Sequence, residues 1–346
     1  MISPVKNHQN KTQLILRPIL ASIFGLLAGA VFVFFTDVNP LKAMGTLLNS
    51  GFGCNKNGFC AIWTMFQYAT PLILTGLSAL MAFRVRIFSI GQAGQMVLGA
   101  GLANWAAYNL AAPGFLHPAS ALLCAMLASA LYALVPAVLK VYLDVNEIIS
   151  TIVLNSIAGF LVGLVPGGWG RRIPESAKLP ALVHGTKFNS GFFIAIAALI
   201  LIYIFLWHTS TGYEIRMAGQ SPKFAKAGGV STVRSVMIAM AISGALAGLA
   251  GGIEVLGVHY NLVSNFMGSD NFDGLVIALL GQVHPVGVFI SALFLGGIRL
   301  GAMTGLSIQL GVPRSLGGIM IAVMVIFMGM DSFNDLLGRL IPKRRK

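Results

Sequence analysis

Long apolar runs separated by short polar segments repeat along almost the whole chain. A helix needs about 20 predominantly apolar residues to cross a bilayer, and most of these runs approach that length. The pattern predicts an all-α polytopic membrane protein with about ten transmembrane helices. The expected spans are residues 18–36, 65–83, 88–110, 118–139, 148–165, 192–207, 236–253, 275–280, 287–303 and 316–330. A transmembrane barrel would instead show short segments of alternating polarity, which the sequence lacks.

Composition agrees with this pattern. Apolar residues make up 56% of the chain and charged residues only 10%, whereas charged residues are roughly 25% of an ordinary soluble domain. The formal net charge is +13, but the basic residues lie between the spans and at the chain ends. Membrane topology therefore explains them better than a nucleic acid partner, and no such partner is expected. The partner of the spans themselves is membrane lipid.

The distribution of basic residues predicts an orientation. Ten crossings place both termini on one side, and the positive-inside rule favours the cytoplasm for that side. Fifteen of the 23 basic residues are then cytoplasmic: Lys6, Lys11, Arg17, Arg84, Arg86, Lys140, Arg216, Lys223, Lys226, Arg234, Arg339, Lys343, Arg344, Arg345 and Lys346. Four basic residues in the loop 166–190 count against this orientation. The predicted domains are a cytoplasmic tail 1–16, a transmembrane domain 17–334 and a basic cytoplasmic tail 335–346.

The segment 212–234 is charged in a chain with few charges, so it is predicted to be a loop that faces water. Ser221 and Pro222 have the order of a helix N-cap followed by Pro at the first helical position. A short helix over residues 222–227, closed by Gly228 and Gly229, fits this order. Such a helix suits docking into a groove of another protein. A solvated connector is the alternative.

Two apolar segments are interrupted at their ends. The third span opens with SIGQAGQ (89–95), and the stretch 254–285 is polar and glycine-rich before a short apolar run. Interruptions in corresponding places indicate an inverted repeat whose broken half-helices meet near the bilayer midplane, where transporters build their binding sites.

Polar residues near these interruptions are candidates for a solute path. A polar group within a span usually faces a cavity or another helix. The candidates are Gln92, Gln95, Glu147, Asn155, Asp270 and Asp273. Helix capping competes with this interpretation near span starts and is preferred for Asn146. Glu147 is left open between helix-start electrostatics and a gate, whereas Asn155 lies too deep in its span to cap it.

The sequence contains few signals for a disulfide, a metal site, an enzyme active site or a nucleotide site. Cys54 and Cys60 flank a polar loop, and the sequence leaves open whether they form a disulfide or remain free thiols. The histidines lack metal-ligand spacing, so no metal is expected. No nucleophile–base set suggests an enzyme, and no phosphate-binding loop with the sequence GxxxxGK[ST] is present. An ATP-driven process would therefore need a different chain for the nucleotide.

Four ordered blocks carry a family resemblance. They are FSIGQAGQMVLGA (88–100), NEIISTIVLNSIAGFLV (146–162), GYEIRMAGQSPKFAKAGGV (212–230) and NFDGLVIALLGQVHPVGV (271–288). Together they resemble the permease subunits of bacterial ABC importers for nucleosides and simple sugars, which are related to ribose and branched-chain amino acid permeases. The nucleoside branch commonly has an acid in the pattern NIGxEGQ, where this chain has SIGQAGQ, so the solute is left open.

The resemblance implies a transport subunit of the bacterial cytoplasmic membrane and several partners. These are an ABC ATPase that binds ATP and Mg, a second permease (paralogue or identical copy) and an extracytoplasmic solute-binding lipoprotein. This chain itself would bind no cofactor. The helix in the segment 212–234 would couple to the ATPase through Glu214, Arg216, Gly219, Gln220, Ser221, Ala225, Lys226 and Gly228. An ion-gradient-driven secondary transporter of a small polar solute is the alternative function.

Overall fold

The computed structural model describes residues 34, 38–54, 60–110, 112–166, 169–263, 266, 273–312, 318–319 and 322. Both predicted tails, Asp270, and nearly all of the predicted spans 18–36 and 316–330 lie outside these residues. The chain divides into two compact units. Unit 1 contains residues 70–278, and unit 2 contains residues 6–69 and 279–346.

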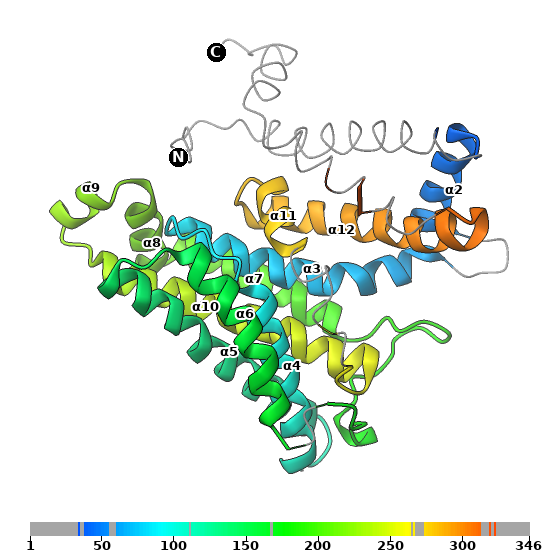
Figure 1. The fold of residues 1–346 in the computed structure, drawn as a ribbon, viewed down its shortest axis with the longest axis horizontal. Helices are drawn as coiled ribbons and strands as arrows, with labels where there is room; N and C mark the ends of the chain where they lie inside the picture. The colour runs from blue at the N-terminus through cyan, green and yellow to red at the C-terminus, as the bar shows by residue number, and fades with distance from the viewer. Residues whose placement is uncertain are drawn as a thin grey trace, which may run out of the picture. The chain divides into compact units, whose positions relative to one another are not determined.

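The regular elements of unit 1 are helices and short helical turns, joined by loops (Figure 1). Unit 1 contains the second part of α3 (Ala61–Arg84), α4 (Gln92–Asn109), α5 (Leu116–Leu143), α6 (Glu147–Leu164), the 3-10 turn η1 (Glu175–Ala177), α7 (Gly191–His208), α8 (Ser210–Gln220), α9 (Pro222–Ala227), α10 (Thr232–Glu254), the π-helical turn η2 (Val255–His259) and most of α11 (Asp273–Leu280). Unit 2 contains α2 (Pro40–Phe52), the start of α3, α12 (Pro285–Gly301) and the π-helical η4 (Ala302–Gln309).

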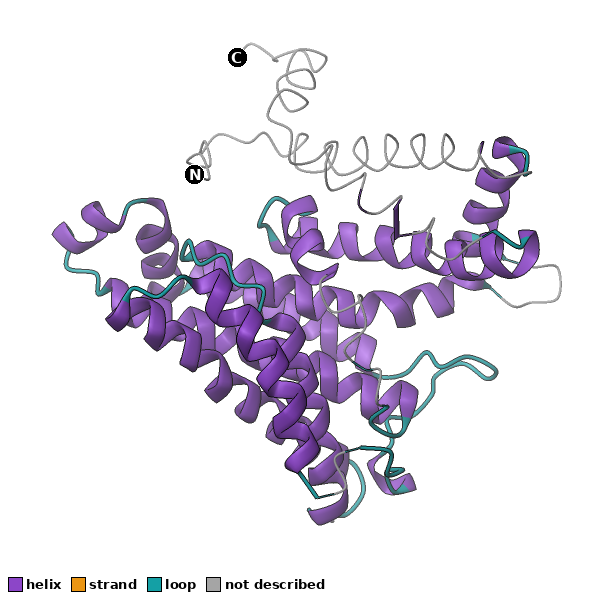
Figure 2. Cartoon of the chain, in the orientation of Figure 1, coloured by secondary structure: helices purple, strands orange, loops and turns teal. Residues whose placement is uncertain are grey.

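The predicted fold class is confirmed: the regular elements of the described residues are helices, and Figure 2 shows no strand among them. Within these residues, six helical segments are long and apolar enough to cross a membrane. They are 61–84, 116–143, 147–164, 191–208, 232–259 and 285–309. The predicted total of ten spans is not tested by this number, because the first and last predicted spans lie outside the described residues.

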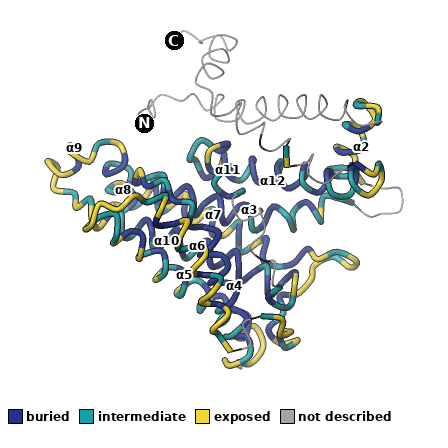
Figure 3. The backbone as a smooth tube through the Cα atoms, in the orientation of Figure 1, coloured by how far each residue is buried: buried dark blue, intermediate teal, exposed yellow. Residues whose placement is uncertain are grey.

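Glycines bring α4, α5 and α10 together in the core of unit 1. A Cβ added at Gly248 would collide with the Ala125 carbonyl and the Ser129 side chain of α5. A Cβ added at Gly99 of α4 would collide with the backbone of Gly248. The sequence predicts this close approach from the four-residue spacing of Gly244, Gly248 and Gly252, and the structure confirms it. Accordingly, much of α4 and α10 is coloured as buried in Figure 3.

The helix α2 in unit 2 is a correction to the sequence analysis, which treats residues 37–64 as a loop. Its start is set by Asn39, whose side chain accepts a hydrogen bond from the Leu41 N–H at 3.0 Å, with Pro40 at the first helical position. Its buried positions Ala43, Leu47 and Gly51 are four residues apart and form one narrow face. A helix of 13 residues is too short to cross a membrane, so the search for long apolar runs misses it.

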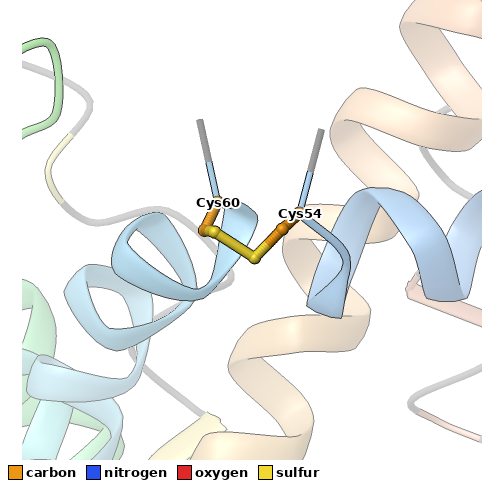
Figure 4. The surroundings of a disulfide bond; sticks show 2 residues. All are labelled: Cys54 and Cys60. Atoms are coloured by element: carbon orange, nitrogen blue, oxygen red, sulfur yellow. A yellow bond between two sulfur atoms is a disulfide. The ribbon is translucent and has the colours of Figure 1, made fainter. Parts of the chain in front are cut away.

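Cys54 and Cys60 follow α2 and precede α3. In the structure their sulfurs form a disulfide across a sequence separation of six residues (Figure 4). The bond ties the end of α2 to the start of α3 within unit 2. Of the two alternatives that the sequence leaves open, the structure has the bonded one.

Candidate functional site

The helix α9 matches the predicted short helix in both of its bounds. The Ser221 hydroxyl accepts a hydrogen bond from the Phe224 N–H at 3.4 Å, and Pro222 occupies the first helical position. Gly228 caps the other end, and Gly229 has φ +80°, a conformation that favours glycine. Four residues of α9 and its caps thus explain why a helix of six residues forms here at all.

A second helix precedes α9 and corrects the prediction of a loop over 212–234. In α8, the Thr209 hydroxyl accepts a hydrogen bond from the Gly212 N–H at 3.0 Å and caps the helix start. Buried Gly212, Ile215 and Gly219 lie three and four residues apart, which is one face of a helix. The charges of this segment predict a loop, whereas the spacing of Gly212, Ile215 and Gly219 is the signal that indicates a helix.

We call residues 209–229, with α8 and α9, the coupling hairpin, after the role that the sequence predicts for them. Figure 1 shows its two helices next to each other at one end of unit 1. Its exposed surface on α9 includes Lys223, Phe224 and Lys226, and Phe224 is 65% exposed. The sequence analysis does not name Phe224, although a single aromatic residue in a charged segment is a signal for a contact site.

The residues predicted to couple to an ATPase divide into two groups. Gln220 and Lys226 are exposed, as is Gly228, and Glu214, Arg216 and Ser221 are partly exposed. Gly219 and Ala225 are buried against this chain itself. Gly219 lies against the carbonyl oxygen of Arg84, so its role is to let α8 approach the end of α3.

The arginine of α8 stacks on a tryptophan that it shares with α3. The guanidinium carbon of Arg216 lies 5.6 Å from the centre of the Trp207 ring, and that of Arg84 lies 5.2 Å from it. Both distances fall within the range of cation–π attraction. Trp207 therefore joins the ends of α3 and α7 to the coupling hairpin.

The start of α4 corrects the prediction of a span over 88–110. The helix begins at Gln92, and residues 87–90 before it are not helical. Gly94 does not interrupt α4 but lies in its buried first turn. The α4 N-cap, Gly91, has no side chain to bond the free N–H groups of the first turn.

Asn155 of α6 supplies the missing cap from another helix. Its Oδ1 accepts a hydrogen bond from the Gly94 N–H at 2.8 Å, and its Nδ2 donates one to the Ile90 carbonyl at 3.0 Å. The Thr151 hydroxyl accepts a hydrogen bond from the Ile90 N–H at 3.3 Å. The polarity of Asn155 does point to the interior, as predicted, and its amide is used by backbone groups.

These bonds place the start of α4 at depth within the bundle. Asn155 lies eight residues after Glu147, the first residue of α6, which corresponds to about 12 Å along the helix axis. Non-helical backbone at such depth is tolerated in a membrane only where protein satisfies its polar groups or where it lines a cavity. The chain thus enters the bundle in a non-helical conformation and becomes helical at Gln92.

The predicted path residues Gln92 and Gln95 lie in this buried first turn of α4. They are 2% and 1% exposed. Among the described residues, neither the Gln92 Nε2 nor the Gln95 Oε1 has a hydrogen-bond partner. A buried amide without a partner is costly, and such groups are concentrated at functional positions.

The helix α11 has a similar start. A Cβ added at Gly274 would be 2.7 Å from the backbone carbon of Thr75, so the first turn of α11 lies directly against α3. Thr75 precedes Arg84 by nine residues, about 14 Å along the axis of α3. Asp273 is the first residue of α11 and is partly buried, and Asp270 lies outside the described residues.

Glu147 lies at the turn between α5 and α6, and not in the first turn of α4 with Gln92 and Gln95. Its carboxylate is 3.2 Å from the Lys140 ammonium, which is also 3.0 Å from Asp144. The preceding Asn146 caps α6, accepting hydrogen bonds from the N–H groups of Ile148 and Ile149, which confirms its predicted role. Of the two interpretations of Glu147, this geometry favours helix-start electrostatics.

A polytopic helical bundle in which two helices, α4 and α11, begin against the middle of other helices is typical of a membrane transport subunit. The chain belongs to the family described as branched-chain amino acid transport system / permease component, whose model matches residues 61–329.

The chain is also similar in sequence to several named ABC transporter permeases. The chain is 32% identical to the guanosine ABC transporter permease protein NupP of Bacillus subtilis over 95% of this chain and 97% of that protein. It is 30% identical to the nucleoside ABC transporter permease protein NupB of Lactococcus lactis, covering 97% and 95%. It is 29% identical to the glucose ABC transporter permease protein TsgB13 of Haloferax volcanii, covering 91% and 87%.

Proposed function

We propose that this chain forms the translocation path of an ATP-driven importer for a nucleoside. Two of the three relatives named above are permeases for guanosine or nucleosides, and both align with nearly the whole chain. The glucose permease of Haloferax volcanii makes a simple sugar the second candidate solute. ATP and Mg bind to a partner ATPase, and this subunit performs no bond chemistry.

The observation that carries the coupling role is α9: a capped helix of six residues that presents Phe224 between two lysines. The aromatic ring is an anchor for a groove, and the lysines add attraction to an acidic rim. The coupling hairpin therefore faces the cytoplasm, where the ATPase lies, and the two chain termini are on the same side. The membrane is the cytoplasmic membrane.

The solute path passes the starts of α4 and α11. The N-terminus of a helix carries a partial positive charge, so two such ends at depth attract the hydroxyl and carbonyl oxygens of a nucleoside. Gln92 and Gln95 supply amide donors and acceptors beside one of these ends. Asp273 lies at the other. Asp270, three residues earlier in the sequence, belongs to the same predicted set.

A substitution at Gln92 tests the path. We expect Gln92→Leu to reduce nucleoside uptake about tenfold or more, which corresponds to the loss of one hydrogen bond worth about 1.4 kcal/mol. Leu123→Ala, on the exposed face of α5, is the matched control and should leave uptake unchanged. Competition by unlabelled nucleosides and by glucose then identifies the solute class. Unchanged uptake in Gln92→Leu would remove Gln92 from the path.

Two partners complete the importer: a solute-binding lipoprotein on the outer side and a second permease, identical or paralogous. Purification of the tagged chain from native membranes, followed by mass spectrometry, identifies them together with the ATPase. Uptake should survive collapse of the proton and sodium gradients while ATP is maintained. Loss of uptake under that condition would instead establish an ion-gradient carrier.

A further inference from the structure

The turn that ends α3 contains an arginine in an unusual conformation. Arg86 has φ +59°, in the left-handed region that disfavours residues with a Cβ. The Ile87 N–H donates to the Ala82 carbonyl at 3.1 Å and the Arg86 N–H to the Phe83 carbonyl at 3.1 Å. This bonding pattern is a Schellman motif, in which the residue at the position of Arg86 is usually glycine. Arginine at this position strains the backbone. Such strain is typical of a residue whose side chain has a function.

The side chain of Arg86 bonds the coupling hairpin. Its Nη2 donates a hydrogen bond to the Gln220 carbonyl at 2.8 Å. Gln220 is the last residue of α8, so its carbonyl is one of those that the helix leaves without an internal partner. A guanidinium at a helix C-terminus is also favoured by the helix dipole. Arg86 thus caps α8 from a different element.

Two further contacts hold α8 to the same turn. Gly219, next to Gln220, lies against the Arg84 carbonyl so closely that a side chain would not fit. The guanidinium groups of Arg84 and Arg216 both stack on Trp207. The turn after α3 is therefore attached to the coupling hairpin by three independent contacts.

The same turn leads directly to the proposed solute path. Residues 87–90 follow Arg86 without helical structure, and Ile90 is held by Thr151 and Asn155 of α6. Gln92 and Gln95 come next, in the first turn of α4. A displacement at Arg86 reaches Gln92 through residues 87–91, of which 87–90 are not helical and contain no glycine.

We propose that the segment 84–90 transmits the movement of the coupling hairpin to the start of α4, with Arg86 as the positioning residue that joins the two. The hairpin is joined covalently to α7 and α10, and α10 packs against α4 through Gly248 and Gly251. The contact at Arg86 adds a second connection, which reaches α4 through the residues that precede it in the chain. The inference rests on the proposed function, because it assigns the internal route of coupling in an ATP-driven importer.

Arg86→Gly tests the role of the side chain apart from the turn. Glycine suits the left-handed position, so the thermal unfolding midpoint should stay equal or rise. We expect the number of solutes imported per ATP hydrolysed in proteoliposomes to fall at least about fivefold, the lower end of allosteric coupling factors. Arg86→Lys should retain part of the coupling. Arg234→Gly, at an exposed arginine near the start of α10, is the matched control for charge loss and should import within about twofold of the wild type by the same measure.

A covalent bridge tests the same contact by restoring it. In a background with Cys124→Ser, the double variant Arg86→Cys with Gln220→Cys should be uncoupled until a short bifunctional maleimide joins the two thiols, and coupled again afterwards. An unchanged transport-to-ATP ratio in Arg86→Gly, or a bridge that abolishes transport in an intact complex, would overturn the inference and leave the proposed function standing. A wild-type chain that binds no ATPase would overturn both.

Discussion

The side-chain oxygen of Asn155, in the middle of α6, accepts a hydrogen bond from the backbone N–H of Gly94, in the first turn of α4, at 2.8 Å. One helix thereby caps another from the side. The arrangement lets α4 begin at depth within the bundle without an unpaired N–H at its third position, which would be costly away from water. The start of the proposed solute path depends on this contact.

Asn155→Leu should destabilise the protein by about 1–3 kcal/mol, because the Gly94 N–H and the Ile90 carbonyl lose their buried partners. Thermal or denaturant unfolding of the purified protein in lipid or detergent measures the effect. Val153→Ala, on an exposed part of the same helix, should change stability by no more than about 0.5 kcal/mol. Equal stability of Asn155→Leu and wild type would show that the cap is dispensable.

Gly248→Val should prevent the close packing of α10 against α5, since the new side chain meets the Ala125 carbonyl and Ser129. We expect a loss of about 1–3 kcal/mol or more and a lower yield of folded protein in membranes. The comparison variant is Gly45→Ala in α2, where an added Cβ meets nothing within 4 Å. It should be neutral or stabilising by up to about 1 kcal/mol, because alanine favours helices. A well-folded Gly248→Val variant would contradict the packing role of this glycine.

Phe224→Ala should weaken binding of the partner ATPase about 30-fold, the effect of losing an anchor worth about 2 kcal/mol. Because Phe224 is 65% exposed, the fold of this chain should be unaffected. Titration of the purified ATPase against the permease in nanodiscs gives the affinity. Lys223→Ala, at the neighbouring exposed position, should cost only a few-fold, and equal effects of the two variants would argue against an aromatic anchor.

The disulfide predicts a distinct labelling pattern. Without a reductant, an alkylating reagent should modify only Cys124 in the denatured protein, and with a reductant all three cysteines. Replacing Cys54 and Cys60 by serine should lower the free energy of unfolding by about 2 kcal/mol, as the chain-entropy relation gives for so short a loop. Cys124→Ser is the control and should leave the reductant dependence intact. Three reactive thiols in the non-reduced protein would show that the bond does not form in the cell.

The sequence by itself determined the helical membrane class, the family and the helix α9. The class follows because long apolar runs have few stable alternatives to helices in a bilayer. The bounds of α9 follow because Ser221, Pro222 and Gly228 act on the backbone locally, so no distant contact is needed. The cap at Asn146 is local in the same way, and it too was predicted correctly.

Only the tertiary structure decided where α4 begins and what α8 contacts. Residues 88–91 are as apolar as the helix that follows them, and their non-helical conformation is stabilised by Asn155 and Thr151, which are more than 60 positions away in sequence. Arg86 looked like one more basic residue at a span end, because a hydrogen bond to a carbonyl 134 positions away leaves no trace in local sequence. Helix caps and apolar spans depend on residues that are neighbours in sequence. The partners of buried polar groups are determined only when the helices pack together.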